Sequence, residues 1–230
     1  MRKAGMETMK KYLLFDLDGT LTDPMEGITN SVAYALEYYG IHVEDRRTLI
    51  PFIGPPLKES FMKYFDFPEE RAQEAIWKYR EYFTERGMFE NAVIPGIPEA
   101  LEHLKSSGGI LITATSKPEI YAKQIMEKFG LSTWFTDICG ADLEETRVKK
   151  EEVIAYALEK NGITDLSRVV MVGDREHDIF GAKKCGLKSV GVLFGYGSRE
   201  ELEAAGADFV AETVEEMEKG CEMLLAQCAG

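Results

Sequence analysis

Two aspartates separated by one residue follow a short apolar run near the start of the chain. The run at residues 12–15, YLLF, has the length and composition of a strand buried on both faces, and Asp16 and Asp18 come directly after it. Side chains alternate along a strand, so both carboxylates should point the same way. Because two close carboxylates repel each other, a cation must lie between them or one must stay protonated. The pair therefore predicts a functional site, although an ordinary strand-ending turn would also contain Asp and Gly.

A second pair of aspartates follows another apolar run, at residues 169–173. Asp174 ends this predicted strand and Asp178 lies about one helical turn further along, so both side chains can reach one ion. Oxygen ligands without supporting cysteine or histidine favour Mg²⁺ over zinc. The alternative is a helix-capping aspartate followed by an aspartate on the surface.

Hydroxyl groups follow a third apolar run, at residues 109–114. Thr115, Ser116 and Lys117 come next, and Pro118 opens a predicted helix whose free N–H groups favour an anion. Thr115 is therefore a candidate donor to a phosphoryl oxygen, with an ordinary N-cap as the alternative.

Two lysines, Lys149 and Lys150, open a further predicted helix. The helix dipole disfavours cations at this end, so their placement indicates a function. A solvated pair of lysines is the simpler alternative.

The elements that must position these clusters alternate between strand and helix. Beyond the first strand we predict strands at residues 109–114, 136–139, 169–172, 188–192 and 208–210, and helices at residues 98–106, 118–129, 150–161, 178–185 and 214–225. This alternation predicts an α/β fold with a doubly wound parallel sheet. Ligands bind such sheets outside the carboxyl ends of the strands, where the polar clusters fall.

One long segment departs from the alternation. Residues 24–92 contain predicted helices at residues 25–39, 45–50, 57–64 and 68–86, and Pro51, Gly54, Pro55 and Pro56 predict a rigid loop that is not helix interior. We therefore predict a core made of residues 1–23 and 93–230, with an inserted helical cap domain at residues 24–92.

Composition narrows the classes of partner. The 230 residues carry a net charge of −13, which argues against a nucleic acid polymer or an anionic membrane as the main partner. The four cysteines show neither metal-site spacing nor the density of a disulfide scaffold, and the first ten residues lack the apolar core of a signal peptide. We expect a cytoplasmic protein, and we expect a monomer because no coiled-coil pattern indicates obligate assembly.

Taken together, the clusters resemble the haloacid dehalogenase superfamily of phosphatases. The four motifs of that superfamily resemble, in order, residues 16–20 (DLDGT), Thr115, Lys150, and Gly173-Asp174 with Asp178. The spacing to the following helix favours Lys150 over Lys149 as the motif lysine. The helical insertion is similar to the small cap of the phosphoglycolate-phosphatase-like group, and residues 52–57 (FIGPPL) are similar to cap segments of bacterial members labelled 5′-nucleotidases.

The resemblance implies a Mg²⁺-dependent phosphatase. Asp16 is expected to attack phosphorus and form an aspartyl phosphate, while Asp18 protonates the leaving alkoxide and later deprotonates the attacking water. Thr115 and Lys150 are expected to stabilise the phosphoryl oxygens. The expected metal ligands are Asp16, Asp18 through its backbone carbonyl, Asp174 and Asp178, the last either directly or by orienting Lys150.

The expected substrate is a small phosphate monoester such as phosphoglycolate or a nucleoside monophosphate. The residues expected to contact it are Gly19, Thr20, Ser116 and Lys117 in the core and Gly54 and Lys58 in the cap. One alternative is a phosphomutase, which returns the phosphoryl group to a sugar. The other is a receiver-like phospho-acceptor domain, but its acceptor would lie in the middle of the chain and it would have no helical insertion.

Overall fold

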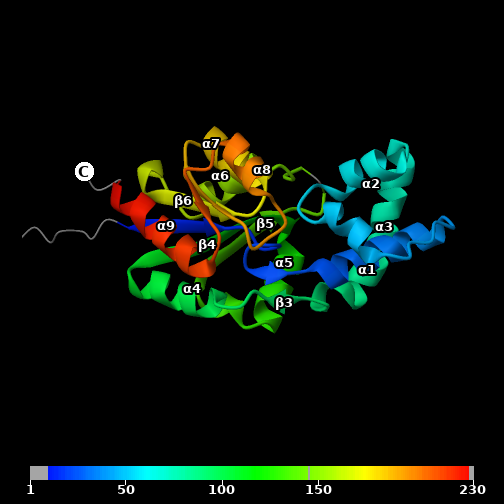
Figure 1. Ribbon diagram of the computed structural model, residues 1–230, viewed down its shortest axis with the longest axis horizontal. Helices are drawn as coiled ribbons and strands as arrows, with labels where there is room; N and C mark the ends of the chain where they lie inside the picture. The colour runs from blue at the N-terminus through cyan, green and yellow to red at the C-terminus, as the bar shows by residue number, and fades with distance from the viewer. Residues whose placement is uncertain (1–9, 145, 228–230) are drawn as a thin grey trace, which may run out of the picture.

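Six parallel strands form the central sheet of the computed structural model, which describes residues 10–144 and 146–227 (Figure 1). The sheet order is β5-β4-β1-β6-β7-β8. The strands are β1 (Lys11–Phe15), β4 (Gly109–Pro118), β5 (Phe135–Ala141), β6 (Val169–Gly173), β7 (Lys188–Val192) and β8 (Phe209–Ala211). The predicted α/β fold with a parallel, doubly wound sheet is thereby confirmed.

Helices cover both faces of this sheet. One face carries α4 (Ile97–Ser106), α5 (Glu119–Lys128) and α9 (Val214–Gln227); the other carries α6 (Lys150–Lys160) and α7 (Glu176–Lys184), with α8 (Arg199–Ala205) beside α7. The alternation along β1 explains the two layers, because Leu13 packs in one buried cluster with Leu101 of α4, whereas Leu14 packs in another with Val153 of α6. Among the described helices, none combines the length and apolarity needed to cross a bilayer.

A group of helices lies beyond one end of the sheet, on the right of Figure 1. It contains α1 (Met25–Tyr38), a 3₁₀ helix (Arg46–Phe52), α2 (Leu57–Phe65) and α3 (Glu69–Glu85). The chain enters and leaves this group through β2 (Thr22–Asp23) and β3 (Ala92–Val93), which pair antiparallel. Its buried side chains, such as Val32 and Phe83, belong to the same hydrophobic cluster as Phe15 of the central sheet.

Several local predictions differ from the structure. Pro51 lies inside the 3₁₀ helix rather than in a loop, because a short helix tolerates the fixed φ of proline and the loss of one N–H donor. Pro118 does not open a helix but ends β4 and caps α5. Helix α8 was not predicted, although Ser198 accepts a hydrogen bond from the N–H of Glu201 and so caps its start. Three-residue 3₁₀ helices at Gly87–Phe89, Leu131–Thr133 and Leu166–Arg168 were also not predicted.

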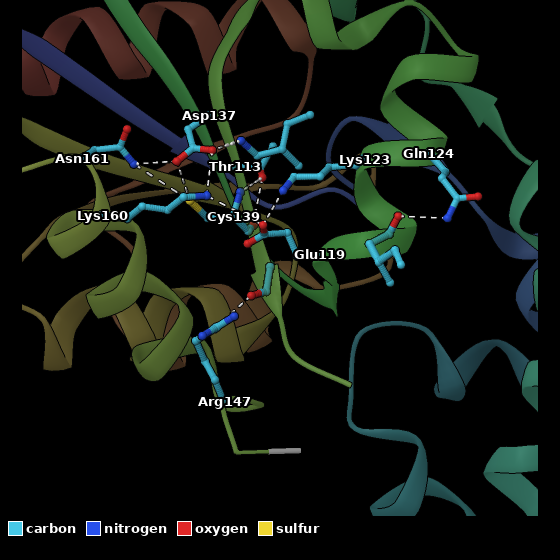
Figure 2. A network of polar contacts seen from close by, with 12 residues as sticks. Thr113, Glu119, Lys123, Gln124, Asp137, Cys139, Arg147, Lys160 and Asn161 are labelled. Atoms are coloured by element: carbon cyan, nitrogen blue, oxygen red, sulfur yellow. Dashed lines mark hydrogen bonds and ion pairs between the residues drawn. The ribbon is translucent and has the colours of Figure 1, made fainter. Parts of the chain in front are cut away.

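A polar network fastens α5 and α6 to the edge strand β5 (Figure 2). Lys160 Nζ lies 3.0 Å from Asp137 Oδ1 and 3.7 Å from Glu119 Oε1. Asn161 donates a hydrogen bond to Asp137 Oδ2 at 3.3 Å. These contacts join the last residue of α6 to the middle of the strand, so they hold the helix that also carries Lys150.

Candidate active site

Asp16 and Asp18 follow β1 and line a single cavity of about 350 Å³. The Asp16 N–H donates to the carbonyl of Val172 at 2.9 Å, which continues the pairing of β1 with β6. Both aspartates are buried, so each carboxylate is held by the protein rather than by bulk water. Both carboxylates thus open onto the same cavity, in keeping with the strand alternation.

Asp174 and Asp178 join Asp16 in a cluster of three buried carboxylates. One oxygen from each lies within 4.8 Å of the others, although the residues come from two loops far apart in sequence. Asp174 directly follows β6, the neighbour of β1, and Asp178 lies in the first turn of α7. Parallel pairing of β1 and β6 therefore brings both predicted aspartate pairs to the same edge of the sheet.

Lys150 supplies a positive charge to this cluster. Its ammonium lies 2.9 Å from Asp16 Oδ1 and 2.8 Å from Asp178 Oδ1, and it donates a hydrogen bond to the Ala114 carbonyl at 2.9 Å. Burial alone would lower the pKa of Lys150, but Asp16 and Asp178 outweigh burial and raise it. Lys149, by contrast, is exposed at the N-cap of α6, so the structure brings Lys150 and not Lys149 to the carboxylates.

The carboxylate cluster fits a divalent cation. Burial, followed by the charges of Asp178 and Asp16, raises the pKa of Asp174 well above its usual value. Burial likewise raises the pKa of Asp178 against the opposing effect of Lys150. One lysine does not balance three acids this close together, whereas a hard cation with oxygen ligands does. In the described part of the chain, Asp18 is not among the clustered carboxylates, which leaves its backbone carbonyl as the predicted ligand.

The carboxyl group of Asp18 instead faces Lys117. Lys117 Nζ lies 2.8 Å from Asp18 Oδ2, and the same ammonium lies 4.7 Å from the ring centre of Phe83 on α3. Burial raises the pKa of Asp18, and Lys117 partly offsets that rise. Asp18 Oδ1 is buried and has no hydrogen-bond partner among the described residues, so one oxygen of this carboxyl group remains available to carry a proton.

The other core residues predicted to bind substrate divide into two groups. Thr115 and Ser116 line the cavity, and the Thr115 hydroxyl accepts the N–H of Lys117 at 3.2 Å, which leaves its proton free to be donated. Gly19 and Thr20 pack on Asp174 instead. Gly19 has φ +79°, and a Cβ there would lie 2.3 Å from Asp174 Oδ2; the Thr20 hydroxyl donates to Asp174 Oδ1 at 3.4 Å.

Gly54 and Lys58, the two predicted cap residues, also line the cavity. Lys58 forms an ion pair with Glu69 at 2.6 Å, and 32% of its side chain is exposed. Four aromatic residues, Phe52, Tyr79, Phe83 and Tyr121, also line the cavity, together with aliphatic and charged side chains. These aromatic residues were not predicted as site residues, because helical spacing alone does not separate a cavity wall from a core.

Tyr196 makes a further contact with the carboxylate cluster. Its backbone N–H donates to Asp174 Oδ2 at 2.8 Å, and its phenol donates to the carboxylate of Asp23 on β2. The Gly-Tyr-Gly run at residues 195–197 is the sequence signal, since glycines on both sides let this loop approach Asp174 closely. Tyr196 therefore connects the carboxylate cluster with the strand that leads into α1.

A family model for haloacid dehalogenase-like hydrolases matches residues 13–192, a span that contains every cluster of this site. The chain belongs to this family. The resemblance found in the four motifs is thereby confirmed. As a haloacid dehalogenase-like hydrolase, the chain carries its carboxylate cluster within the matched span.

Relatives of this hydrolase carry several names. A 5′-nucleotidase from Pseudomonas aeruginosa is 47% identical and covers 84% of this chain and 86% of its own length. A tyrosine-protein kinase PtkA from Mycobacterium tuberculosis is 37% identical, covering 90% and 71%, and a phosphoglycolate phosphatase from Vibrio parahaemolyticus is 28% identical, covering 90% and 94%. The crystal structure of a predicted phosphatase from Clostridium acetobutylicum superposes with a TM-score of 0.90 at 49% identity, covering 93% of this chain and 99% of its own. The chain is a phosphatase of the haloacid dehalogenase-like family.

Proposed function

We propose that this phosphatase is Mg²⁺-dependent and hydrolyses a small phosphate monoester through an aspartyl phosphate on Asp16. One observation carries the proposal: the Asp16 carboxylate contacts the Lys150 ammonium, clusters with the carboxylates of Asp174 and Asp178, and lines the same cavity as Asp18. A carboxylate nucleophile paired with a lysine, beside an acid of raised pKa, is the arrangement that such a displacement needs.

In the first half of the reaction, an Asp16 oxygen bonds to phosphorus while the bond from phosphorus to the leaving oxygen breaks. Asp18 gives its proton to that oxygen, so the alcohol leaves neutral. The raised pKa of Asp18 keeps the proton available in the free enzyme. Thr115 and Lys150 donate to the phosphoryl oxygens, whose charge distribution changes in the transition state.

In the second half, Asp18 acts as a base. Its carboxylate takes a proton from water, and the water oxygen bonds to phosphorus as the bond from Asp16 to phosphorus breaks. Inorganic phosphate leaves, and both aspartates return to their starting states. The closeness of Lys117 to Asp18 stabilises the carboxylate form that this half requires.

The metal ligands in this proposal are the carboxylates of Asp16, Asp174 and Asp178 and the backbone carbonyl of Asp18. Bound Mg²⁺ supplies positive charge that lowers the repulsion between the phosphoryl oxygens and the carboxylates. Gly19 and Thr20 act by positioning Asp174, and Tyr196 does so from the other side. This role replaces direct substrate binding for Gly19 and Thr20.

For the substrate we favour a nucleoside monophosphate over phosphoglycolate. The cavity holds about 350 Å³ and four aromatic residues contribute to its wall, which suits a leaving group that contains a planar ring. Phosphoglycolate is much smaller, and its carboxylate gains nothing from aromatic rings. The 47% identity to a protein named 5′-nucleotidase supports the same choice.

We also propose that residues 24–92 act as a cap domain over a core of residues 1–23 and 93–230. Residues of α2 and α3 line the same cavity as Asp16 and Asp18, so movement of these helices would open or close the site. The β2–β3 pair, at the two points where the chain crosses between the parts, is the natural hinge.

The test is hydrolysis of p-nitrophenyl phosphate and a panel of nucleoside 5′-monophosphates, with and without Mg²⁺. Removing Mg²⁺ with a chelator should abolish turnover, and Asp16→Asn should lower kcat by about four orders of magnitude or more because the nucleophile is lost. Radiolabelled phosphate should appear on the wild-type protein as a hydroxylamine-labile acyl phosphate but not on Asp16→Asn. Wild-type activity in the Asp16→Asn variant would exclude the mechanism.

The same experiment separates the alternatives. A phosphomutase would return the label to a sugar phosphate rather than to inorganic phosphate. A receiver-like domain would keep its acyl phosphate for much longer than one catalytic cycle. Transfer of phosphate from ATP to protein tyrosine, which the name of the mycobacterial relative raises, would leave labelled tyrosine instead of inorganic phosphate.

A further inference from the structure

Arg175 is a core residue whose side chain reaches the cap. It follows Asp174 in the loop between β6 and α7. Its Nη1 donates to the carbonyl oxygen of Ile53 at 2.9 Å, and its Nε lies 2.8 Å from Glu201 Oε1 on α8. The same Glu201 oxygen accepts the backbone N–H of Glu176 at 2.8 Å. The guanidinium group therefore forms an ion pair with the core through Nε and a hydrogen bond with the cap backbone through Nη1.

The backbone of Arg175 is tied to the carboxylate cluster. Its N–H donates to Asp178 Oδ2 at 3.0 Å, while Asp178 Oδ1 faces Lys150. One residue thus contacts both the cluster and the cap, through different groups. A side-chain substitution removes the contact with the cap and leaves the backbone contact with Asp178 in place.

The cap segment is shaped to receive this side chain. Gly54, the residue after the carbonyl acceptor, has φ +100°, and a Cβ there would lie 3.2 Å from Arg175 Cγ. The next residues, Pro55 and Pro56, have a fixed φ, so the position of Ile53 constrains the path of the backbone through residues 54–58. Residues 54–58 all line the cavity.

We propose that Arg175 is a positioning residue that holds residues 53–58 of the cap over Asp16 and Asp18, and thereby sets which leaving groups the enzyme accepts. The inference rests on the proposed phosphatase mechanism. Arginine suits the role because its planar fork bonds a carbonyl and a carboxylate at the same time, in two directions. Lysine presents a single ammonium and cannot keep both contacts at these positions.

The test compares Arg175→Ala and Arg175→Lys with Arg199→Ala. Arg199 lies on the same helix as Glu201, but its ion pairs with Glu203 and Glu212 are on the exposed surface, so it is a matched control. We expect kcat/KM for p-nitrophenyl phosphate to fall by about tenfold to a hundredfold in both Arg175 variants, the effect of losing a charge-assisted hydrogen bond. Acetyl phosphate, with its small leaving group, should lose much less, and the Mg²⁺ concentration for half-maximal rate should not change.

Hydrogen–deuterium exchange gives a measurement that does not need activity. Peptides covering residues 46–65 should exchange faster in Arg175→Ala, with peptides from β1 and β4 unchanged and Arg199→Ala like the wild type. Wild-type exchange of residues 46–65 in folded Arg175→Ala would overturn the inference, and so would an equal loss for both substrates. If the wild-type protein hydrolysed neither p-nitrophenyl phosphate nor acetyl phosphate, the proposed mechanism would fail, and the exchange result would still decide whether Arg175 holds the segment.

Discussion

Lys150 and Lys160 are the first and last residues of α6, and each lies within ion-pair distance of two carboxylates. The helix dipole favours the cation at position 160 and disfavours the one at position 150. Their burial also differs, since 3% of the Lys150 side chain is exposed and 33% of Lys160. The helix dipole therefore stabilises the Lys160 ammonium beside β5 (Figure 2). At the active site, Asp16 and Asp178 stabilise the Lys150 ammonium against an unfavourable dipole.

Charge balance and exposure distinguish the structural ion pairs at β5 from the ion pairs at the active site. At β5 the carboxylates of Asp137 and Glu119 are partly exposed, and they meet two lysines, because Lys160 pairs with both and Lys123 pairs with Glu119, so their charges are balanced. At the active site three carboxylates share one buried lysine, and water does not reach them freely. The uncompensated charge there is what a divalent ion and a phosphoryl group would meet.

The largest expected effect is the loss of activity when Lys150 is replaced, with the same replacement of Lys160 as the comparison. Lys150→Met should lower kcat for p-nitrophenyl phosphate by about a hundredfold to a thousandfold, because a donor to the phosphoryl oxygens is lost. Lys160→Met should keep the wild-type rate and lose about 1 kcal/mol or less of unfolding free energy, since its ion pairs are partly exposed. Steady-state kinetics and urea denaturation measure the two effects. Equal losses of activity in both variants would remove the distinction drawn between the two ends of α6.

A smaller effect is expected from Lys117→Met. Burial raises the pKa of Asp18 and Lys117 lowers it, so removing Lys117 should raise that pKa further. The protonated form of Asp18 then persists to higher pH, and the alkaline limb of the kcat/KM profile should move upward by about one pH unit or more. Lys123→Met is the matched control, because Lys123 pairs with Glu119 at the surface of α5. An unchanged alkaline limb would show that Lys117 does not control Asp18.

The smallest effect is the pH dependence of stability at the β5 network. Burial raises the pKa of Asp137, but Lys160 outweighs burial, so the folded-state pKa lies below the ordinary value. A carboxylate of this kind stabilises the fold above its unfolded pKa of about 3.9 and loses that contribution as pH falls through the folded value. Asp137→Asn should therefore lower the free energy of unfolding by about 1 kcal/mol or less at pH 7. The difference from the wild type should vanish in strong acid. Urea denaturation at several pH values measures it, and a difference that grew on acidification would contradict the assignment.

Much of the core was predictable because its signals are local. The apolar runs that became β1 and β6 are buried on both faces, and such runs identify a parallel strand without knowledge of its neighbours. The two-residue strands β2 and β3 were not predictable, since nothing in Thr22–Asp23 marks it as the partner of Ala92–Val93. Helix α8 has a serine cap and acidic first-turn residues, which are signals that could have been used.

The site was predictable in residue types but not in its contacts. The motif positions of Asp16, Asp174 and Lys150 could be proposed from order and spacing along the chain. The pairing of Lys117 with Asp18, and the hydrogen bond from Arg175 to Ile53, join segments from separate loops and have no local signature. Exposure decided between Lys149 and Lys150, and exposure depends on the packing of α6 against β4.

The amino-acid sequence determined the alternating strands and helices, the polar residues that end each strand, and through them the family, because these depend on side-chain periodicity and on turn chemistry within a few residues. Tertiary structure decided which carboxylates cluster, which lysine reaches them, and which part of the helical insertion contacts Arg175. Those choices depend on distances between segments far apart in the chain: 122 residues separate Arg175 from Ile53, and 154 separate Asp174 from Thr20. Only the order of strands in the sheet brings such loops together, and no local pattern encodes it.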